Sequence, residues 1–132
     1  MKLSNLFKRS DAPAVPDRPV FVREYTNATT FRGMHRLPIA SYGDAEATRN
    51  CEDIIGDEGE HLCKGQTITL SGLRFDGGTG IKVLVDGALV GVVWERQDEG
   101  LYRSAYSGNI ESVFVRLSRD PDGRCRCALF VK

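Results

Sequence analysis

The stretch 66-QTITLSGLRFDGGTGIKVLVDGALVGVVWE-95 decides the fold, because aliphatic and β-branched runs flank an Asp-Gly pair at its centre. Asp86-Gly87 between two apolar runs predicts a β-hairpin with a type I′ turn, which needs a positive φ at both central residues. A two-residue loop also fixes the register, because a slip by one residue would exchange the two faces of the hairpin. The pairs predicted in this way are Val85–Ala88, Val83–Val90 and Ile81–Val92, all on one face that Trp94 extends.

In the strand before this hairpin, the alternation of apolar and other residues shifts by one position in the middle. Ile68 and Leu70 share one phase, whereas Leu73 and Phe75 share the other, and Gly72 lies at the break. A glycine in this position predicts a β-bulge or a barrel corner. The glycine-rich residues 76–80 that follow are interpreted as a hairpin loop and not as a phosphate cradle, since no Lys-Ser/Thr pair follows them.

The rest of the chain adds shorter strands and two helices to this centre. A strand is predicted over 20–25, a short strand within 31–39 and a helix over 43–55, which Asp44 could cap. A second short helix follows Asp98 as its N-cap and ends at Gly108. The turn at 120–123 predicts a closing hairpin with the pairs Leu117–Cys127, Val115–Leu129 and Val113–Val131.

These elements predict a mainly β fold, either a small, partly open β-barrel or a strongly bent antiparallel sheet, with two short helices. Residues 1–19, with prolines at every third position from Pro13 to Pro19, are expected to form an extended arm. Residues 20–132 then form a single β-rich domain. The arrangement of residues 26–65 stays open at this level.

Composition sets the outer limits on function. The chain has 132 residues, 41% of them hydrophobic and 27% charged, which is ordinary for one globular domain. Its formal net charge is zero, so no global field draws it to nucleic acid. No apolar run reaches the length of about 20 residues that a membrane span needs, and the N-terminus lacks a signal-peptide pattern. A cytoplasmic protein with reduced cysteines is therefore expected.

The cysteines and histidines do not spell out a reaction or a metal site. Cys51, Cys63, Cys125 and Cys127 lack the paired knuckle spacing of structural zinc sites. Core packing of the thiols is the favoured interpretation, with a metal site and a disulfide as alternatives. His35 and His61 belong to no recognisable nucleophile or metalloprotease motif, so we expect neither catalysis, a cofactor nor a bound metal.

Aromatic residues near arginines give the most specific functional signal. Tyr25, Trp94, Tyr102 and Tyr106 lie near the ends of predicted strands, and three arginines lie close to them in sequence, Arg23, Arg96 and Arg103. Aromatic faces beside guanidinium groups can stack unpaired bases and hold phosphates. The alternative is that Trp94 and some of the tyrosines belong to the core.

The order of elements from Gln66 to Val115 resembles that of the HIRAN domain, a small barrel-like β module. Ile81-Lys82-Val83 resembles the first strand of that pattern, 89-LVGVV-93 the second, and Glu99 to Tyr106 lies where its helix would be. This resemblance implies binding of DNA ends or single strands, with a basic and an aromatic residue of the opening strand in contact. The nearest equivalents here are Arg23 and Tyr25.

The function expected from the sequence is a non-catalytic binding module for single-stranded nucleic acid or DNA ends. The residues expected at its site are Arg23, Tyr25, Trp94, Arg96 and Tyr102. A neutral chain predicts weak binding that salt reduces steeply. The runner-up is a protein-interaction or oligomerisation module that uses an exposed sheet edge or the proline-spaced arm, and an enzyme of unrecognised type is a third alternative.

Overall fold

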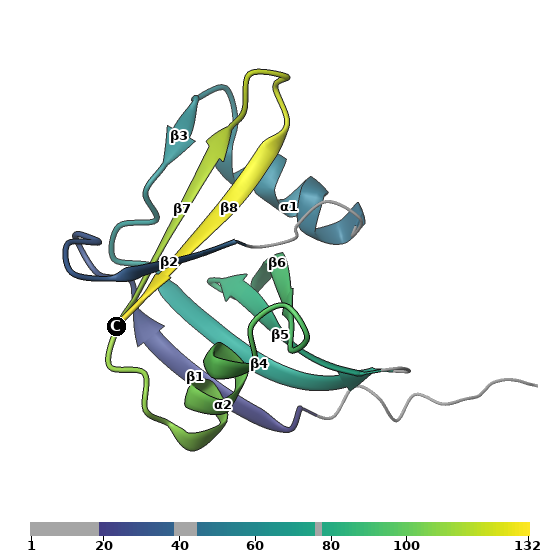
Figure 1. Cartoon of the computed structure of the whole chain (residues 1–132). Coiled ribbons are helices and arrows are strands. Elements are labelled where there is room, and N and C mark those ends of the chain that lie inside the picture. The colour runs from purple at the N-terminus through teal and green to yellow at the C-terminus, as the bar shows by residue number, and fades with distance from the viewer. Residues whose placement is uncertain (1–18, 39–44, 76–77) are drawn as a thin grey trace, which may run out of the picture.

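The computed structural model describes residues 19–38, 45–75 and 78–132 (Figure 1). Within these residues the chain forms eight strands and two helices, and the strands divide between two four-stranded antiparallel sheets. The sheets do not close into a barrel, so the mainly β fold with two short helices is confirmed in its bent-sheet form. The predicted arm, apart from Pro19, and the predicted cap Asp44 lie outside the described residues.

The central hairpin forms as predicted at its turn and departs from the prediction beyond it. Asp86 and Gly87 both have positive φ, 48° and 86°, and they join β5 (Gly78–Val85) to β6 (Ala88–Trp94). Val85 pairs with Ala88 as predicted, but Val83 pairs with Gly91 and Ile81 with Val93, so these two predicted pairs were wrong.

A β-bulge in β6 explains the difference, because it leaves Val90 without a partner on β5. Because of the extra residue, the side chains of β6 after Val90 point to the opposite face of the sheet from the one predicted. Val90 and Val93 therefore both reach the main core, whereas Val92 packs with Leu89 and Trp94 in a separate cluster.

Sheet A has the strand order β1-β4-β5-β6, with β1 at Phe21–Thr26 and β4 at Thr67–Phe75. The register runs through Gly72 without a shift, so of the two alternatives predicted there, a β-bulge or a barrel corner, the bulge was wrong. The glycine has another cause: Phe21 lies opposite it, and a Cβ at Gly72 would overlap the Phe21 ring.

Sheet B has the order β2-β8-β7-β3. Its strands are β2 (His35–Pro38), β8 (Cys125–Val131), β7 (Val113–Arg119) and the short β3 (Glu60–His61). The closing hairpin has the predicted register, with Leu117 opposite Cys127, Val115 opposite Leu129 and Val113 opposite Val131. These residues line the face of sheet B that packs against sheet A.

The two helices lie on different parts of this framework (Figure 1). Helix α1 (Ala45–Ile55) packs on β6 and β8, and Gly56 follows it with a φ of 58°. Helix α2 (Glu99–Ser107) begins at the predicted cap, where Asp98 accepts a hydrogen bond from Leu101 N, and ends at Gly108 in the left-handed region. Leu101 and Ala105, four residues apart on α2, are both buried.

One buried polar side chain joins the sheets. Asn27 follows β1 and is only 3% exposed. Its amide nitrogen donates to the carbonyl oxygens of Leu62, Cys63 and Val115, and its Oδ1 accepts from Val115 N at 2.7 Å. Because every polar atom of this side chain is bonded, burial costs little and the end of β1 is fixed to β7.

Candidate functional site

The five predicted site residues fall into two groups, one on β1 and α2 and the other at the end of β6. Arg23 and Tyr25 belong to β1, Trp94 ends β6, Arg96 follows it, and Tyr102 belongs to α2. Strands β1 and β6 are opposite edges of sheet A. Arg23 and Tyr102 meet at α2, whereas the Trp94 ring packs with Ala47 of α1, Leu89 and Val92. We call the group formed by Phe21, Arg23, Trp94, Arg96, Tyr102 and Tyr106 the α2 site.

At the β1 side, Arg23 is held by the carboxyl end of α2. Its Nε donates to Ala105 O at 2.9 Å and its Nη2 donates to Tyr106 O at 2.6 Å. The last carbonyls of a helix have no partner within the helix, so a guanidinium there stabilises the helix end. The structure therefore gives Arg23 a capping role that the sequence did not reveal.

An aromatic cluster surrounds this cap. The Phe21 ring makes edge contacts with Tyr102 at 5.6 Å and with Tyr106 at 6.1 Å between ring centroids, and Arg23 Cζ lies 5.8 Å from the Phe21 centroid. Tyr106 is 55% exposed, so it is the member of the cluster that offers most surface to a ligand. Phe21 was not predicted as a site residue.

The two tyrosines that were predicted are less accessible. Tyr25 packs partly buried against the main core, and burial raises the pKa of its hydroxyl, an effect that Arg23 opposes. Burial also raises the pKa of Tyr102, and the nearby Glu95 carboxylate adds to the rise. This proximity places Tyr102 between β1 on one side and the end of β6 on the other.

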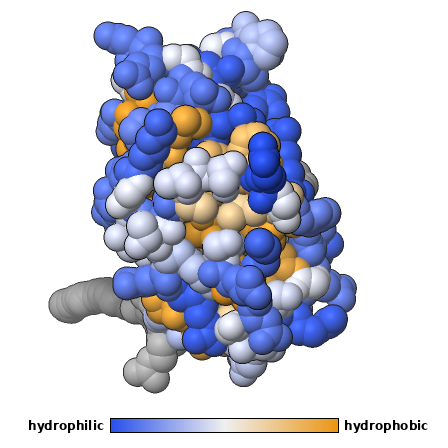
Figure 2. Space-filling view, turned by 90° about the vertical axis from the view of Figure 1, so that its left-hand side faces the viewer, coloured by the Kyte–Doolittle hydropathy of each residue, from blue (hydrophilic) through white to orange (hydrophobic). Residues whose placement is uncertain are grey.

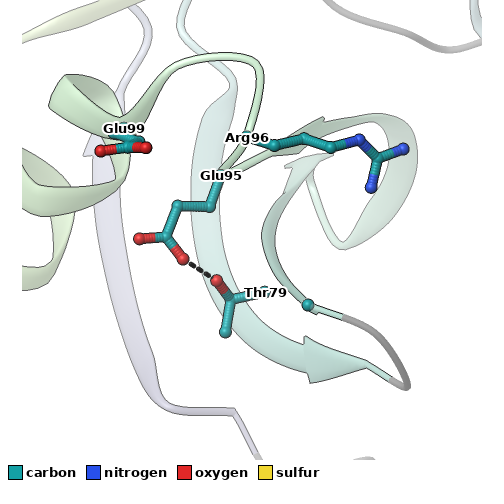
Figure 3. Close-up of a pocket in the computed structure, with 5 residues that line it drawn as sticks. Thr79, Glu95, Arg96 and Glu99 are labelled. Carbon is teal, nitrogen blue, oxygen red and sulfur yellow. Dashed lines mark hydrogen bonds between the residues drawn. The ribbon is translucent and has the colours of Figure 1, made fainter.

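At the β6 side, Arg96 Cζ lies 5.3 Å from the Trp94 ring. A hollow of about 410 Å³ lies beside this pair and is lined by Gly78, Thr79, Glu95, Arg96 and Glu99 (Figure 3). Thr79 Oγ1 donates to Glu95 Oε1, and Figure 3 shows Arg96 extending away from both glutamates. The hollow thus holds two carboxylates beside one guanidinium, which weakens its attraction for a phosphate.

A second cavity, of about 300 Å³, lies between α2 and sheet B. Its apolar lining comes from Leu37, Leu101, Ile110 and Val131, and its polar lining includes His35, Asp98, Ser104, Asn109 and Lys132. A histidine, an acid and a serine share this cavity, but no hydrogen bond joins His35 to Asp98 or Ser104 in the described part of the chain. Asp98 instead accepts from Leu101 N as the helix cap, so the three do not form a nucleophile–base–acid relay.

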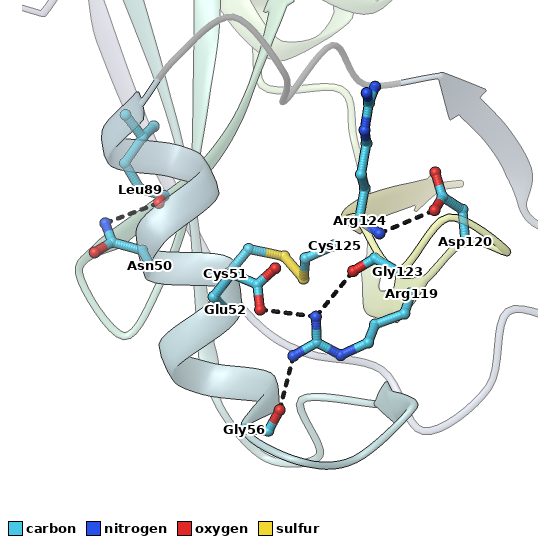
Figure 4. Close-up of a disulfide and its surroundings, with 10 residues drawn as sticks. All are labelled: Asn50, Cys51, Glu52, Gly56, Leu89, Arg119, Asp120, Gly123, Arg124 and Cys125. Carbon is cyan, nitrogen blue, oxygen red and sulfur yellow. Dashed lines mark hydrogen bonds and ion pairs between the residues drawn. A yellow bond between two sulfur atoms is a disulfide. The ribbon is translucent and has the colours of Figure 1, made fainter.

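The cysteines depart from the expectation that all four are reduced (Figure 4). Cys51 of α1 and Cys125 of β8 form a disulfide across 74 residues of sequence. Cys63 and Cys127 are free, buried thiols; burial raises the pKa of Cys63 to about 12 and raises that of Cys127 as well. A pairing so distant in sequence depends on where α1 docks, which the cysteine spacing alone does not reveal.

The same contact between α1 and the β7–β8 hairpin carries polar bonds. Arg119 Nη1 lies 2.7 Å from Glu52 Oε1, and its Nη2 donates to Gly56 O at 2.8 Å (Figure 4). Arg119 therefore closes the carboxyl end of α1 as Arg23 closes that of α2. Among the described residues no group of three or more His, Cys, Asp or Glu could hold a metal ion.

His61 takes part in a hydrogen-bonded chain at the central turn. Its Nε2 lies 2.8 Å from Gln66 Oε1, and Gln66 Nε2 donates to Asp86 Oδ2 at 2.7 Å. Asp86 Oδ1 accepts from Thr67 N, and these bonds, that of Gln66 above all, lower the pKa of Asp86. These hydrogen bonds hold the Asp86-Gly87 turn against the start of β4.

Comparison with known proteins finds no match to this chain among family models, curated proteins or solved structures. The site is therefore interpreted from its own geometry. No helix in the described ranges has the length and apolar character needed to cross a membrane.

Proposed function

We propose that this chain is a non-catalytic binding module and that its ligand is single-stranded nucleic acid held at the α2 site. One observation carries the proposal: two separate aromatic groups each have a guanidinium within 6 Å, Arg96 at Trp94 and Arg23 at Phe21. Bases stack on aromatic faces whatever their sequence, and arginines beside them hold the phosphates. The HIRAN resemblance points to the same class of ligand.

The geometry also ranks the residues. Arg23 already bonds two carbonyls, whereas the side chain of Arg96 makes only its contact with the Trp94 ring among the described residues, so Arg96 is the better candidate for a phosphate contact. Glu95 and Glu99 lie close by and repel phosphate. Binding is therefore expected to be weak and to fall steeply with salt.

The test is fluorescence anisotropy of a labelled oligothymidylate at low and moderate salt. The sequence holds one tryptophan, so quenching of Trp94 fluorescence reports directly on base stacking at this site. Arg96→Ala should weaken binding and lower the salt slope by about 0.7, the value for one phosphate contact on a single strand. Lys64→Ala is the matched control, because it removes one exposed charge at the opposite end of β4 from Gly78. Wild-type protein that binds no oligonucleotide at low salt would refute the proposal.

Self-association through β1 is the second candidate, and a specific observation favours it. Among the described residues the exposed large hydrophobic side chains are Val20, Val22, Phe31 and Tyr106, and three of these lie on or beside β1. β1 pairs only with β4 in the described part of the chain, so its other edge can accept a strand. Mass that rises with protein concentration, and that Val22→Lys abolishes, would support this function.

A further inference from the structure

A second aromatic surface lies on the outer face of sheet B, far in sequence from α2. Phe114 of β7 and Phe130 of β8 are cross-strand partners there, and Phe31 from the β1–β2 loop stacks on Phe130 with ring centroids 4.7 Å apart and planes 25° apart. Arg116 Cζ lies 5.9 Å from both Phe31 and Phe130. We call Phe31, Phe130, Arg116 and the neighbouring Arg32 and Arg36 the Phe31 platform.

The exposure of these rings is uneven. Phe114 and Phe130 are 3% and 5% exposed, whereas Phe31 is 45% exposed. Because one face of the Phe31 ring lies on Phe130, its accessible area belongs to the other face and the edge. Figure 2 views the molecule from the side on which the β1–β2 loop lies in Figure 1, and it shows hydrophobic residues reaching the surface between hydrophilic ones. An open aromatic face on a sheet is the arrangement on which unpaired bases stack.

The charge around this ring is positive. Residues 27–38 contain Arg32, His35 and Arg36 and no acid. Arg32 and Arg36 are exposed, and neither has an ion pair within the described ranges. Arg36 lies opposite Phe130 in the β2–β8 register, so its backbone position adjoins the stacked rings. Arg116 differs, because it pairs with Glu60 at 3.6 Å and its Cζ lies 5.9 Å from each of the two ring centroids.

The contrast with the α2 site decides the partner. There Arg96 stands beside two carboxylates, of which Glu99 pairs with Arg103 at 3.9 Å, whereas here two exposed guanidinium groups, with no acid in residues 27–38, flank an exposed aromatic ring. An apolar peptide would gain from Phe31 but not from uncompensated arginines, while a single strand uses both.

We propose that the Phe31 platform is a second contact surface for single-stranded nucleic acid, with a base stacked on Phe31 and phosphates at Arg32 and Arg36. This inference rests on the proposed function. Because the two surfaces belong to different sheets, a strand that is long enough contacts both, and one that is too short binds at only one of them.

The experiment compares Phe31→Leu, Arg36→Gln and Lys64→Gln in oligothymidylate binding, followed by anisotropy and by Trp94 fluorescence. Phe31→Leu keeps an apolar cover over Phe130 while it removes the aromatic face, and thermal unfolding checks that the fold persists. We expect Phe31→Leu to weaken binding roughly five-fold or more. Arg36→Gln should lower the salt slope by about 0.7, and Lys64→Gln should lower it less. Quenching of Trp94 at saturation should remain, since the α2 site is intact.

The outcomes separate this inference from the proposed function. Wild-type binding that Arg96→Ala reduces but Phe31→Leu and Arg36→Gln leave unchanged overturns the second surface and keeps the α2 site. No binding by wild-type protein at low salt overturns both. Mass that rises with concentration and is lost in Phe31→Leu would assign this face to self-association and overturn the inference too.

Discussion

The disulfide between α1 and β8 gives the sharpest test of the structure. Cys51 and Cys125 are 74 residues apart in sequence, so the bond closes a long loop in the unfolded chain. In the chain-entropy description, a closed loop of this length stabilises the folded state by about 4.5 kcal/mol. A domain of this size has a free energy of unfolding of about 5 to 15 kcal/mol, so reduction should remove a large part of the stability.

The assay is urea unfolding of the oxidised and the reduced protein. Reduction should lower the free energy of unfolding by about 4 kcal/mol, while α1 stays docked in the reduced protein through Arg119, Glu52 and the Gly56 carbonyl. The control is the double variant Cys51→Ser and Cys125→Ser, in which a reductant should have no further effect. Equal stability of the oxidised and reduced wild type would refute the loop-closure argument.

Thiol counting tests the same bond and the cytoplasmic prediction together. Burial raises the pKa of Cys63 to about 12 and raises that of Cys127, so both thiols are protonated near pH 8 and react slowly in the folded protein. After unfolding without reductant, two thiols should react. Four reactive thiols would show that the cysteines are all reduced, as the sequence had led us to expect of a cytoplasmic protein.

Three other predictions concern single side chains. Asn27→Ala should lower the free energy of unfolding, measured by urea titration, by about 3 kcal/mol. The reason is that it leaves buried backbone groups at Val115 and in the Leu62–Cys63 segment without hydrogen-bond partners. A loss below about 1 kcal/mol would contradict this explanation. Gly72→Ala should cost about 1 to 3 kcal/mol through overlap with Phe21, and adding Phe21→Leu should recover part of the loss. Hydrogen bonds lower the pKa of Asp86, so its contribution to stability is present above the ordinary carboxyl pKa and is lost as pH falls through the lowered value. Asp86→Asn should therefore flatten the fall of the urea midpoint at pH values below the ordinary carboxyl pKa of about 3.9, and an unchanged profile would exclude Asp86 as its source.

Local signals in the sequence predicted the parts of the fold that depend on neighbouring residues. Asp86-Gly87 fixed one turn, and Asp98 and Gly108 fixed both ends of α2, because the backbone at those positions needs a particular residue type. The register of the closing hairpin followed from its turn in the same way. The bulge at Val90 did not follow, since it depends on which face of β6 meets α1 and which meets the main core.

Contacts between distant segments account for the other departures. The ring that requires glycine at position 72 belongs to Phe21, 51 positions earlier in the sequence. Without knowledge of that partner, a glycine in a strand suggests a bulge. Arg23 reaches α2 across 82 residues. The sequence placed Arg23 and Tyr25 among the site residues by their types, but their backbone and core partners become visible only in the folded chain.

The arginines illustrate how this difference affects function. A guanidinium that donates to helix carbonyls, as Arg23 and Arg119 do, must give up those bonds before it can hold a phosphate, and the helix end then loses its cap. Arg96, Arg32 and Arg36 have no such bonds to lose among the described residues, so phosphate contact there costs less. Under the proposed function, affinity for a single strand should therefore depend more on these three arginines than on Arg23. Substituting Arg23 should instead lower the stability of α2, and the two kinds of arginine can be told apart by measuring binding and unfolding on the same variants.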